Sequence, residues 1–439
     1  MEKLRVALNG TVVGTLEKHA GGALSFVYQE AWLAQAGSRA ISLSLPLQPE
    51  PFRGDVVYNF FDNLLPDSEL IRSRIQTRFR TVTKQPFDLL ASIGSDCVGA
   101  IQLYPEHAEV APVKQVNAVP VSDEEIERLL QGYREAPLGM GPNSDDFRIS
   151  LAGAQEKTAL LWFDNQWCRP ERSTPTSHII KLPIGHIAHN NLDLSESCEN
   201  EWLCLRMAEQ FGLPVAQTQL ASFGEQRVLI VERFDRRWSR DNSWLIRLPQ
   251  EDFCQALGIA PALKYEADGG PGIAAAMELL LGSQQPLLDR DTFFKSQIVF
   301  WMLAAIDGHA KNFSLFLQPE TTYRMTPLYD VLSGYPFMHA RGIAPQKAKM
   351  AMAAIGKGRH YRWSQILPRH FISTARAVGY SEEKTLQVMA ELKAQTEQAI
   401  VNVEAMLPDD FPRSVSEAIF AGVRRQADRL PRLENNNSK

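Results

Sequence analysis

The chain has 439 residues, of which 44% are apolar and 22% charged, and it carries a formal net charge of -5 at pH 7. This length exceeds one ordinary hydrophobic core, so two or three domains are expected. The composition excludes a disordered or fibrous protein, and the mild negative charge argues against a surface built mainly for binding nucleic acid.

The first segment, residues 1–106, alternates like the strands of a small β-rich subdomain. Asn9-Gly10 is its strongest local signal, because both residues tolerate the positive φ of a two-residue hairpin turn. We expect strands at 4–8, 11–14, 42–45 and 98–103, and helices near 59–78 and 86–93.

The usual sequence signs of export, membrane insertion and zinc binding are missing. The chain enters its first strand without a basic and apolar leader, and its longest apolar run, 298–306, is much shorter than the roughly 20 residues of a membrane span. The cysteines are odd in number and lack the paired spacing of zinc ligands. They are Cys97, Cys168, Cys198, Cys204 and Cys254. We expect a cytoplasmic protein with reduced thiols and no structural metal.

Residues 107–146 predict a linker followed by a helix. Between Pro105 and Pro120 the periodicity is lost and Pro, Ala and Val gather, which is typical of an exposed connection. The helix is expected to open at Ser122, because Glu125 stands three residues later as in a capping box.

Residues 147–245 predict a second β-rich segment. The expected strands flank a tight loop within 147–162 and lie at 179–182 and 228–231. A helix between the last two is expected to open at Asp193 and Glu196, a second candidate capping box, and to end near Gly212.

The remaining segment, residues 246–439, is almost wholly helical in pattern. Near its end, buried-type residues repeat every three or four positions: Leu386, Met389, Leu392, Thr396, Ala399, Val403 and Met406. A β-rich segment followed by a helical one is the two-lobe layout of a protein kinase, here with an extra subdomain in front. The expected fold class is α+β, with a β-rich N-lobe and an all-helical C-lobe.

Residues 307–312 carry the main chemical signal. Phosphoryl transfer needs a base-like carboxylate at the acceptor hydroxyl and oxygen ligands for Mg²⁺. Asp307 and Asn312 offer both and stand five positions apart, as in protein kinases. Such a pair is expected about once by chance in a chain of this length, and an ordinary helix end at Asp307-Gly308 is the alternative.

The residues that follow strengthen this interpretation. Residues 313–318 and 323–327 predict a hairpin that leads to Asp330, where a second Mg²⁺ carboxylate belongs. Val331-Leu332 follow Asp330 in place of the Phe-Gly of kinases, so the glycine switch is absent.

Residues further upstream are candidates for holding ATP. Lys181, on a short strand, is expected to bind the α- and β-phosphates and to be oriented by Glu199 or Glu201, with Glu201 preferred. The loop 150–158 stands between two apolar strands, where a glycine-rich loop would cover the phosphates, although it has one glycine instead of three. Backbone groups of 232–234 could pair with adenine. Each feature also has an ordinary explanation: Lys181 could be a solvated lysine, the loop 150–158 a polar hairpin, and residues 232–234 the end of a strand.

Six segments in order resemble the HipA family of serine/threonine kinase toxins, over nearly the whole chain. They are 59–66, 147–158, 178–183, 232–236, 264–272 and 307–312. The resemblance implies that Asp307 is the catalytic base and that Asn312 and Asp330 bind Mg²⁺. The ATP-binding residues that it implies are Ala152, Gly153, Ala154, Gln155, Glu156, Lys157, Lys181, Glu232, Arg233, Phe234, His309, Ala310, Lys311, Asn312, Tyr329, Asp330, Val331 and Leu332.

The resemblance also implies regulation and partners. The family places an autophosphorylated serine at the start of the ATP loop, where Ser150 stands, and phosphate there would favour ejection of the loop. Its small DNA-binding antitoxin, HipB, carries the toxin onto operator DNA. Lys357 and Arg359, in the basic stretch 347–362, are candidate DNA contacts on what is expected to be a flexible surface segment.

The family's targets are aminoacyl-tRNA synthetases, chiefly the glutamyl enzyme, whose phosphorylation would cause growth arrest and persistence. Typical serine/threonine kinases carry a phosphate-binding lysine two residues after the catalytic aspartate. His309 stands there in this chain, and Lys311 is the candidate substitute.

Two other functions fit parts of the pattern. Aminoglycoside phosphotransferases also space Asp, Asn and a second Asp along a helical lobe, but their base lies within His-Gly-Asp, whereas His309 follows Asp307. A non-catalytic co-repressor would leave the site vestigial, and the complete set of Lys181, Asp307, Asn312 and Asp330 argues against it.

Overall fold

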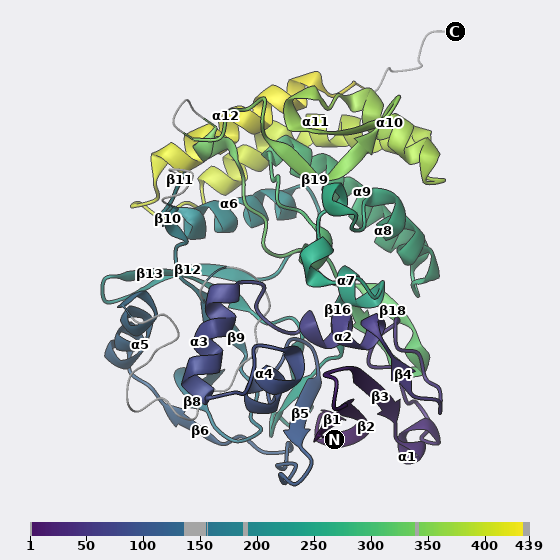
Figure 1. Ribbon diagram of the computed structural model, residues 1–439. Coiled ribbons are helices and arrows are strands. Elements are labelled where there is room, and N and C mark those ends of the chain that lie inside the picture. The colour runs from purple at the N-terminus through teal and green to yellow at the C-terminus, as the bar shows by residue number, and fades with distance from the viewer. Residues whose placement is uncertain (1, 136–154, 156, 188–191, 339–341, 433–439) are drawn as a thin grey trace. The chain divides into compact units, whose positions relative to one another are not determined.

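The structure is a computed structural model that describes residues 2–135, 155, 157–187, 192–338 and 342–432 (Figure 1). The chain divides into two compact units. Unit 1 comprises residues 1–182, 217–264 and 314–324, and unit 2 comprises residues 183–216, 265–313 and 325–439.

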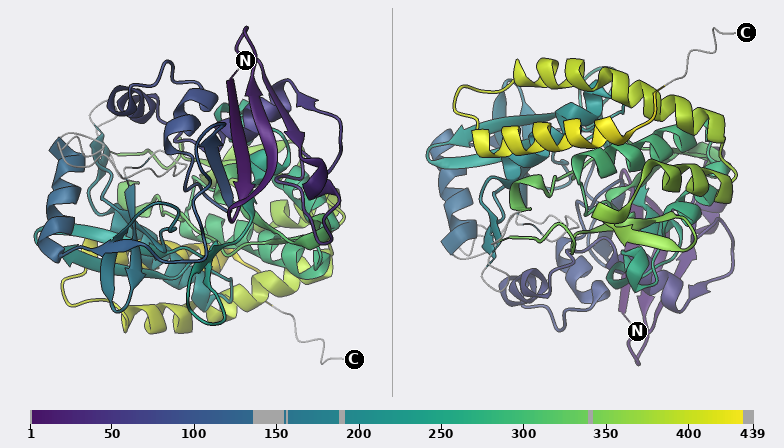
Figure 2. Two further views of the ribbon diagram at one scale, coloured as in Figure 1. Left: turned by 90° about the horizontal axis from the view of Figure 1, so that it is seen from below. Right: turned by 90° about the horizontal axis from the view of Figure 1, so that it is seen from above.

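Unit 1 begins with an antiparallel sheet of order β4-β3-β2-β1-β5, whose strands lie side by side near the N-terminus in Figure 2. The strands are β1 (Glu2–Leu8), β2 (Thr11–Lys18), β3 (Leu24–Tyr28), β4 (Phe52–Arg53) and β5 (Ile101–Pro105). Asn9 and Gly10 have φ of 45° and 77°, as the turn between β1 and β2 requires. The helices of this region are α1 (Glu30–Leu33), α2 (Asp55–Asp62), α3 (Glu69–Phe79) and α4 (Pro86–Ile93).

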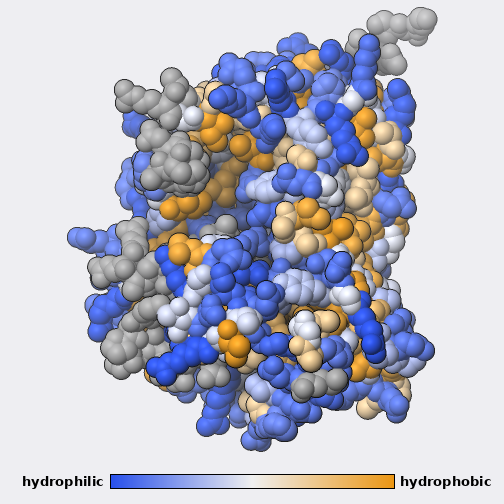
Figure 3. All heavy atoms as spheres, in the orientation of Figure 1, coloured by the Kyte–Doolittle hydropathy of each residue, from blue (hydrophilic) through white to orange (hydrophobic). Residues whose placement is uncertain are grey.

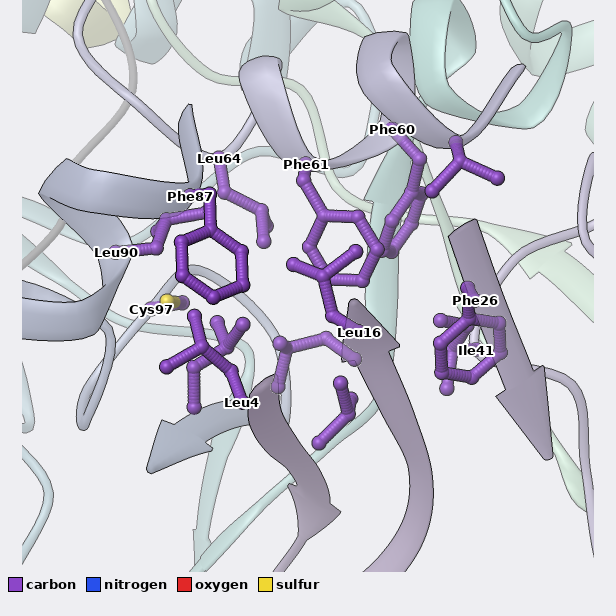
Figure 4. Packing of buried hydrophobic residues seen from close by; sticks show 14 of the residues in the cluster. Leu4, Leu16, Phe26, Ile41, Phe60, Phe61, Leu64, Phe87, Leu90 and Cys97 are labelled. Carbon is purple, nitrogen blue, oxygen red and sulfur yellow. The ribbon is translucent and has the colours of Figure 1, made fainter. Parts of the chain in front are cut away.

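Buried apolar side chains fill the space between this sheet and its helices. Leu4 of β1, Leu16 of β2 and Phe60 and Phe61 of α2 belong to one buried cluster (Figure 4). The rings of Phe60 and Phe61 meet edge-on with centroids 5.1 Å apart. Each fully buried side chain of this kind contributes about 1.5–3 kcal/mol, so this packing defines a hydrophobic core for the first hundred residues.

A second sheet of unit 1 has the order β12-β13-β9-β7-β8-β6. Its strands are β6 (Ala118–Pro120), β7 (Lys157–Phe163), β8 (Gln166–Pro170), β9 (His178–Lys181), β12 (Thr218–Phe223) and β13 (Gln226–Glu232). Helix α5 (Asp123–Glu135) contacts β12 and β13. Its capping box is confirmed, because Ser122 N–H donates to Glu125 Oε2 at 2.8 Å and Glu125 N–H donates to Ser122 Oγ at 3.2 Å.

Short elements complete unit 1. They are β14 (Arg236–Trp238), β15 (Leu245–Arg247), β16 (Gln250–Asp252), α7 (Phe253–Ala256), β17 (Ser314–Leu317) and β18 (Tyr323–Met325), with 3-10 turns at Pro261–Leu263 and Pro319–Thr321. Strands β16, β17 and β18 form one sheet, so the predicted hairpin before Asp330 is confirmed.

Unit 2 is mainly helical. Its helices are α6 (Ser197–Gln210), α8 (Ile273–Leu279), α9 (Pro286–Leu303), α10 (Pro368–Ala377), α11 (Glu382–Glu404) and α12 (Arg413–Arg429). Helices α11 and α12 lie side by side in Figure 2 and both contact α6. Helix α9 is buried along most of its C-terminal half, which matches its nearly continuous apolar sequence there.

Unit 2 also contains strands. They are β10 (Gly185–Ile187), β11 (Leu192–Leu194), β19 (Lys349–Ile355) and β20 (Arg359–Arg362). Because β19 and β20 lie within residues 246–439, the expectation that this segment is all helical is wrong. The basic stretch 347–362 is therefore a β-hairpin and not an irregular surface segment. Residues 350–354 of β19 are buried, and burial of one strand holds the hairpin in place. Further 3-10 turns lie at Glu266–Asp268, Leu280–Gly282, Ala310–Asn312, Tyr335–Phe337 and Trp363–Gln365.

Three local predictions fail for identifiable reasons. Ser42 and Leu45 form one isolated bridge across a turn and no strand. The helix expected over 59–78 is two helices, α2 and α3, because Pro66 lies between them and cannot donate a helical hydrogen bond. Asp193 accepts from Ser195 N–H and Oγ, and Glu196 makes no capping bond, so α6 lacks the expected capping box.

Hydrophilic side chains cover most of the face drawn in Figure 3, with smaller hydrophobic patches among them. Among the residues that the structure describes, none of the helices is both long and apolar enough to span a membrane. All of the cysteines are buried.

Candidate active site

The loop from Asp307 to Asn312 is closed on itself by three hydrogen bonds. The Asp307 carbonyl accepts from His309 N–H at 2.8 Å and from Asn312 Nδ2 at 2.8 Å. Asn312 N–H donates to the His309 carbonyl at 2.9 Å. The Asp307 side chain is exposed while Asn312 is buried, so the loop presents one carboxylate to solvent from a fixed backbone.

The position of this loop follows from α9. The helix ends at Leu303, and Ala304 adopts the left-handed conformation that stops it, so Asp307 lies beyond the helix end and is not part of its cap. Gly308 packs against α9 so closely that a Cβ atom there would lie 2.6 Å from the Phe300 ring. The glycine after Asp307 is therefore required by packing.

The segment around Asp330 is tied to the same part of unit 2. Tyr329 Oη donates to the Lys311 carbonyl at 2.9 Å, and Leu328 forms a parallel bridge with Val215. Asp330 has φ of 59°, a conformation that non-glycine residues adopt rarely and at a cost of about 1–3 kcal/mol. The uncommon conformation makes Asp330 a candidate functional position.

Asn200 of α6 clamps the backbone three residues after Asp330. Its Oδ1 accepts from Ser333 N–H at 2.7 Å and its Nδ2 donates to the Ser333 carbonyl at 2.8 Å. Asn200 is fully buried, and Ser333 Oγ donates to the Leu303 carbonyl at 2.6 Å. Asn200 gives no signal in the sequence, since it looks like any polar residue on a helix.

The two candidate phosphate contacts of the loop, His309 and Lys311, are both buried, with exposed fractions of 5% and 6%. The His309 ring meets the Tyr265 ring edge-on, with centroids 5.0 Å apart. The choice between them as the substitute for the kinase lysine stays a prediction.

Tyr265 is the second residue that the sequence analysis missed. Its Oη donates to Asp307 Oδ1 at 2.5 Å, across 42 positions of sequence. Tyr265 lies within the matched segment 264–272, and that position was the only signal that could have pointed to it.

Lys181 lies in the middle of the second sheet of unit 1. It stands opposite Lys157 of β7 and Leu229 of β13, and it is buried, with an exposed fraction of 6%. Gln155 Nε2 donates to the Leu182 carbonyl at 2.5 Å, which brings the end of the predicted ATP loop beside the strand that carries Lys181. Glu199 and Glu201 are both buried on α6 in unit 2, and their pairing with Lys181 stays a prediction.

The remaining residues predicted for the ATP loop lie outside the described residues. These are Ser150, Ala152, Gly153, Ala154 and Glu156.

The predicted hinge follows β13 directly. Glu232 N–H donates to the Gln217 carbonyl and Arg233 N–H to the Ser177 carbonyl, both at 2.9 Å. These two backbone donors are thus already used within unit 1. The Phe234 ring meets the Phe316 ring edge-on, with centroids 5.8 Å apart.

The side chain of Arg233 belongs to a buried cluster of charges. It donates to Asp235 Oδ2 at 2.8 Å, and Arg236 donates to Asp235 Oδ2 at 2.8 Å and to Asp96 Oδ1 at 2.9 Å. Arg247 Nε donates to Asp96 Oδ1 at 3.0 Å. The guanidinium of Arg233 therefore has a structural role, so that a contact with adenine would have to use its backbone carbonyl.

Asn312 and Asp330 offer hard oxygen donors, which is the donor chemistry that Mg²⁺ prefers. Because Asn312 Nδ2 is used by the Asp307 carbonyl, Oδ1 is the amide atom that could bind the ion. In the described part of the chain, three or more His, Cys, Asp or Glu side chains do not gather at any point that could hold a metal ion. Asn312 and Asp330 alone would fit an ion that takes most of its ligands from phosphates and water.

The candidate DNA contacts lie on the β19–β20 hairpin. Lys357 is exposed at its turn, and Arg359 is exposed in β20, with Nε 3.4 Å from Glu266 Oε1. The guanidinium of Arg359 is therefore already paired with Glu266 through Nε. No ion pair of Lys357 is found in the described part of the chain.

Two family models match the chain. The HipA N-terminal domain matches residues 4–104, and the HipA-like C-terminal domain matches residues 149–400. The Y4mE protein of Sinorhizobium fredii is 35% identical over 340 residues, which cover 76% of this chain and 78% of that protein. The serine/threonine-protein kinase toxin HipA of Shewanella oneidensis is 27% identical over 344 residues, 73% of this chain and 75% of that protein.

A solved structure with the same fold comes from the Shewanella oneidensis toxin-antitoxin system, in which HipA is in complex with HipB and operator DNA. The matched chain has a TM-score of 0.80 at 23% identity, with 97% of both chains covered. This likeness shows the α+β fold expected from the sequence. Because the C-terminal family model alone spans more than half of the residues, the chain belongs to the HipA family.

Proposed function

We propose that the chain is an ATP- and Mg²⁺-dependent serine/threonine-protein kinase, the toxin of a HipA/HipB-type toxin-antitoxin system. The observation that carries this proposal is the closed loop from Asp307 to Asn312, which holds an exposed carboxylate and a buried amide on one fixed backbone. Membership of the HipA family supports it, as does the name of the Shewanella oneidensis relative.

In the proposed reaction Asp307 takes the proton of a serine or threonine hydroxyl as its oxygen bonds to the γ-phosphorus of ATP. The bond between that phosphorus and the bridging oxygen breaks, and ADP leaves. Asn312 and Asp330 would hold Mg²⁺, which neutralises charge on the phosphates when bound. Lys181 would contact the α- and β-phosphates from its buried strand.

A transfer assay with γ-labelled ATP tests this proposal. Wild-type protein should label a protein acceptor, and Asp307→Asn should lower the rate by at least about a hundredfold, because it removes the base and keeps the shape. Labelling of an aminoglycoside in place of protein would favour a small-molecule kinase. Equal labelling by wild type and Asp307→Asn would rule out Asp307 as the base.

The nucleotide contacts proposed in unit 1 are residues 152–157, Lys181 and the backbone of 232–234, and those proposed in unit 2 are residues 309–312 and 329–332. Lys181→Met should raise the KM for ATP, because the side chain would lose its contact with the phosphates. An unchanged KM would exclude Lys181 from the nucleotide site.

Ser150 is proposed as the site of self-inactivating autophosphorylation. A phosphoserine would add up to two negative charges beside the ATP phosphates and repel them. Intact mass after incubation with ATP should rise by one phosphate in wild type and stay constant in Ser150→Ala. A wild-type mass that does not change would exclude this route.

The partners proposed for the chain are a HipB-type DNA-binding antitoxin and, through it, operator DNA. The Shewanella oneidensis HipA in the solved complex, which includes HipB and operator DNA, supports this assignment. Charge reversal at Lys357 should weaken operator binding by the toxin-antitoxin complex and reduce its salt dependence. Unchanged binding would place the DNA contact elsewhere.

The proposed substrate is an aminoacyl-tRNA synthetase such as the glutamyl enzyme. Its phosphorylation would arrest growth and produce persistence, and the kinase is proposed to act in the cytoplasm. Incubation of the labelled reaction with purified synthetases identifies the acceptor. A phosphorylated synthetase band that is absent with Asp307→Asn is the expected result.

A further inference from the structure

The phenol of Tyr265 contacts the carboxylate proposed as the catalytic base. Its Oη donates to Asp307 Oδ1 at 2.5 Å, in the range of charge-assisted hydrogen bonds between a hydroxyl and a carboxylate. Both residues belong to unit 2 and stand 42 positions apart. The contact is therefore produced by the fold of unit 2 and not by local sequence.

The backbone of Tyr265 is held by its own turn. The Tyr265 carbonyl accepts from Asp268 N–H at 3.1 Å and from Gly270 N–H at 3.0 Å. The Tyr265 ring also meets the His309 ring edge-on, at an interplanar angle of 88°. Tyr265 thus touches two residues of the 307–312 loop.

Glu266 secures the same turn to the hairpin of unit 2. Its Oε2 accepts from Ala353 N–H of β19 at 2.7 Å, and its Oε1 lies 3.4 Å from Arg359 Nε. Gly272 packs so closely that a Cβ atom there would lie 2.2 Å from Glu266 Cδ. The phenol therefore extends from a turn with a fixed position.

An exposed tyrosine-aspartate pair can be a surface contact of little energetic value. Here the accepting carboxylate is the proposed base, and a base acts only when its oxygen is held near the proton that it removes. Asp307 is exposed, and the terminal torsion of an aspartate is broad. A donor on Oδ1 restricts this torsion and leaves Oδ2 for the acceptor hydroxyl.

We propose that Tyr265 is a positioning residue for phosphoryl transfer, which fixes the Asp307 carboxylate by donating to Oδ1 so that Oδ2 receives the substrate proton. This inference rests on the proposed function of Asp307 as base. Tyr265 keeps its own proton throughout, while the proton of the acceptor hydroxyl moves to Oδ2 as the new bond to phosphorus forms.

The direct test is Tyr265→Phe, which removes only the hydroxyl. Loss of a hydrogen bond to a charged group should lower kcat about tenfold to a hundredfold. The KM for ATP should stay at the wild-type value, because Tyr265 does not bind nucleotide in this proposal. A change in KM alone, or a wild-type kcat, would overturn the inference.

Tyr380→Phe is the matched control. Tyr380 Oη donates to Asp291 Oδ1 at 2.8 Å, so unit 2 contains a second tyrosine-aspartate bond away from the 307–312 loop. Its removal should leave kcat unchanged. A similar fall in kcat for both variants would mean that Tyr265 acts only through the stability of unit 2, which would also overturn the inference.

A measurement without activity separates this inference from the proposed function. With 3-fluorotyrosine at position 265, the fluorine resonance should move in Asp307→Ala, whereas the resonance of 3-fluorotyrosine at position 380 should not. An unmoved resonance at 265 overturns the contact itself. If wild type transfers no phosphate to any acceptor while the resonance moves, the proposed function fails, and the role of Tyr265 in transfer fails with it.

Discussion

Two buried carboxyl sites of unit 1 differ in the groups that surround them, although each joins the N-terminal hundred residues to the segment 233–252. Asp96 accepts from Arg236 and Arg247, whereas Glu251 accepts from Ser42 Oγ at 2.5 Å and Leu43 N–H at 2.9 Å. Burial is nearly complete at both, with exposed fractions of 6% and 0%.

The two carboxyl groups respond to burial in opposite directions. At Asp96 burial alone would raise the pKa, but the charges of Arg236, Arg247 and Arg233 outweigh it and lower the pKa below the ordinary 3.8. At Glu251 burial is not opposed by a nearby cation and raises the pKa to about 8. The surrounding arginines therefore keep the Asp96 carboxyl charged, whereas burial without a cation favours the neutral form of Glu251.

The first prediction breaks the charged site. Asp96→Asn leaves three buried arginines with Asp235 alone, and removal of one partner from a buried ionic cluster costs about 3–5 kcal/mol. The free energy of unfolding in urea at pH 7 should fall by this amount. Glu382→Gln, which removes the exposed pair with Arg376, should change it little. Equal effects of the two would contradict the role of the cluster.

The second prediction concerns the neutral site and pH. Because the pKa of Glu251 is raised in the folded state, its contribution to stability is fully present below about pH 4.5 and is lost as pH rises to about 8. The total loss is roughly 5 kcal/mol at about 1.36 kcal/mol per pKa unit. Asp96 has the opposite sign, since its stabilisation is lost as pH falls through the acid range.

Unfolding curves at pH 5 and pH 8 check the second prediction. The wild-type free energy of unfolding should fall more steeply between these values than that of Glu251→Gln, which keeps an amide of the same shape. Parallel pH dependences would show that Glu251 is charged in the folded protein.

The third prediction extends the comparison to a site in unit 2 that has no charge at all. Asn200→Ala removes both hydrogen bonds to Ser333 and should cost about 1–3 kcal/mol, at all pH values between 5 and 8. Under the proposed function it should also lower kcat, because the clamp fixes the backbone after Asp330. Thermal unfolding and the transfer assay measure the two effects.

The fourth and smallest prediction concerns a surface site. Ser122→Ala removes the capping bond to Glu125 and should lower the free energy of unfolding by about 1 kcal/mol. Ser68→Ala, at the N-terminus of α3, provides a second cap for comparison. An effect as large as that of Asp96→Asn would mean that Ser122 stabilises more of the protein than the N-terminus of α5.

The sequence predicted the features whose cause is local. Asn9-Gly10 needs only its own positive φ values, and the Ser122–Glu125 box needs only three residues of helix. The resemblance to the HipA family, with its α+β fold, rested on six segments in order and is also confirmed.

Features with distant causes were not predictable. Ser42–Leu45 looked like a strand because its apolar residues alternate, but its serine bonds to Glu251, 209 positions away. The bond between Tyr265 and Asp307 and the clamp of Asn200 on Ser333 likewise join separate parts of the sequence. The positive φ of Asp330 gave no sign in the sequence, since aspartate is common at ordinary φ.

The two units are interleaved along the chain. Each consists of three segments, so the chain passes between them five times, and β17 belongs to unit 1 although the 307–312 loop just before it belongs to unit 2. No single cut yields either unit whole: a fragment that stops at Lys264 leaves β16 without the strand to which it is paired. We expect that unit 1 cannot be completed during synthesis until residue 324 has been made, and that a chain that stops before this residue cannot close it.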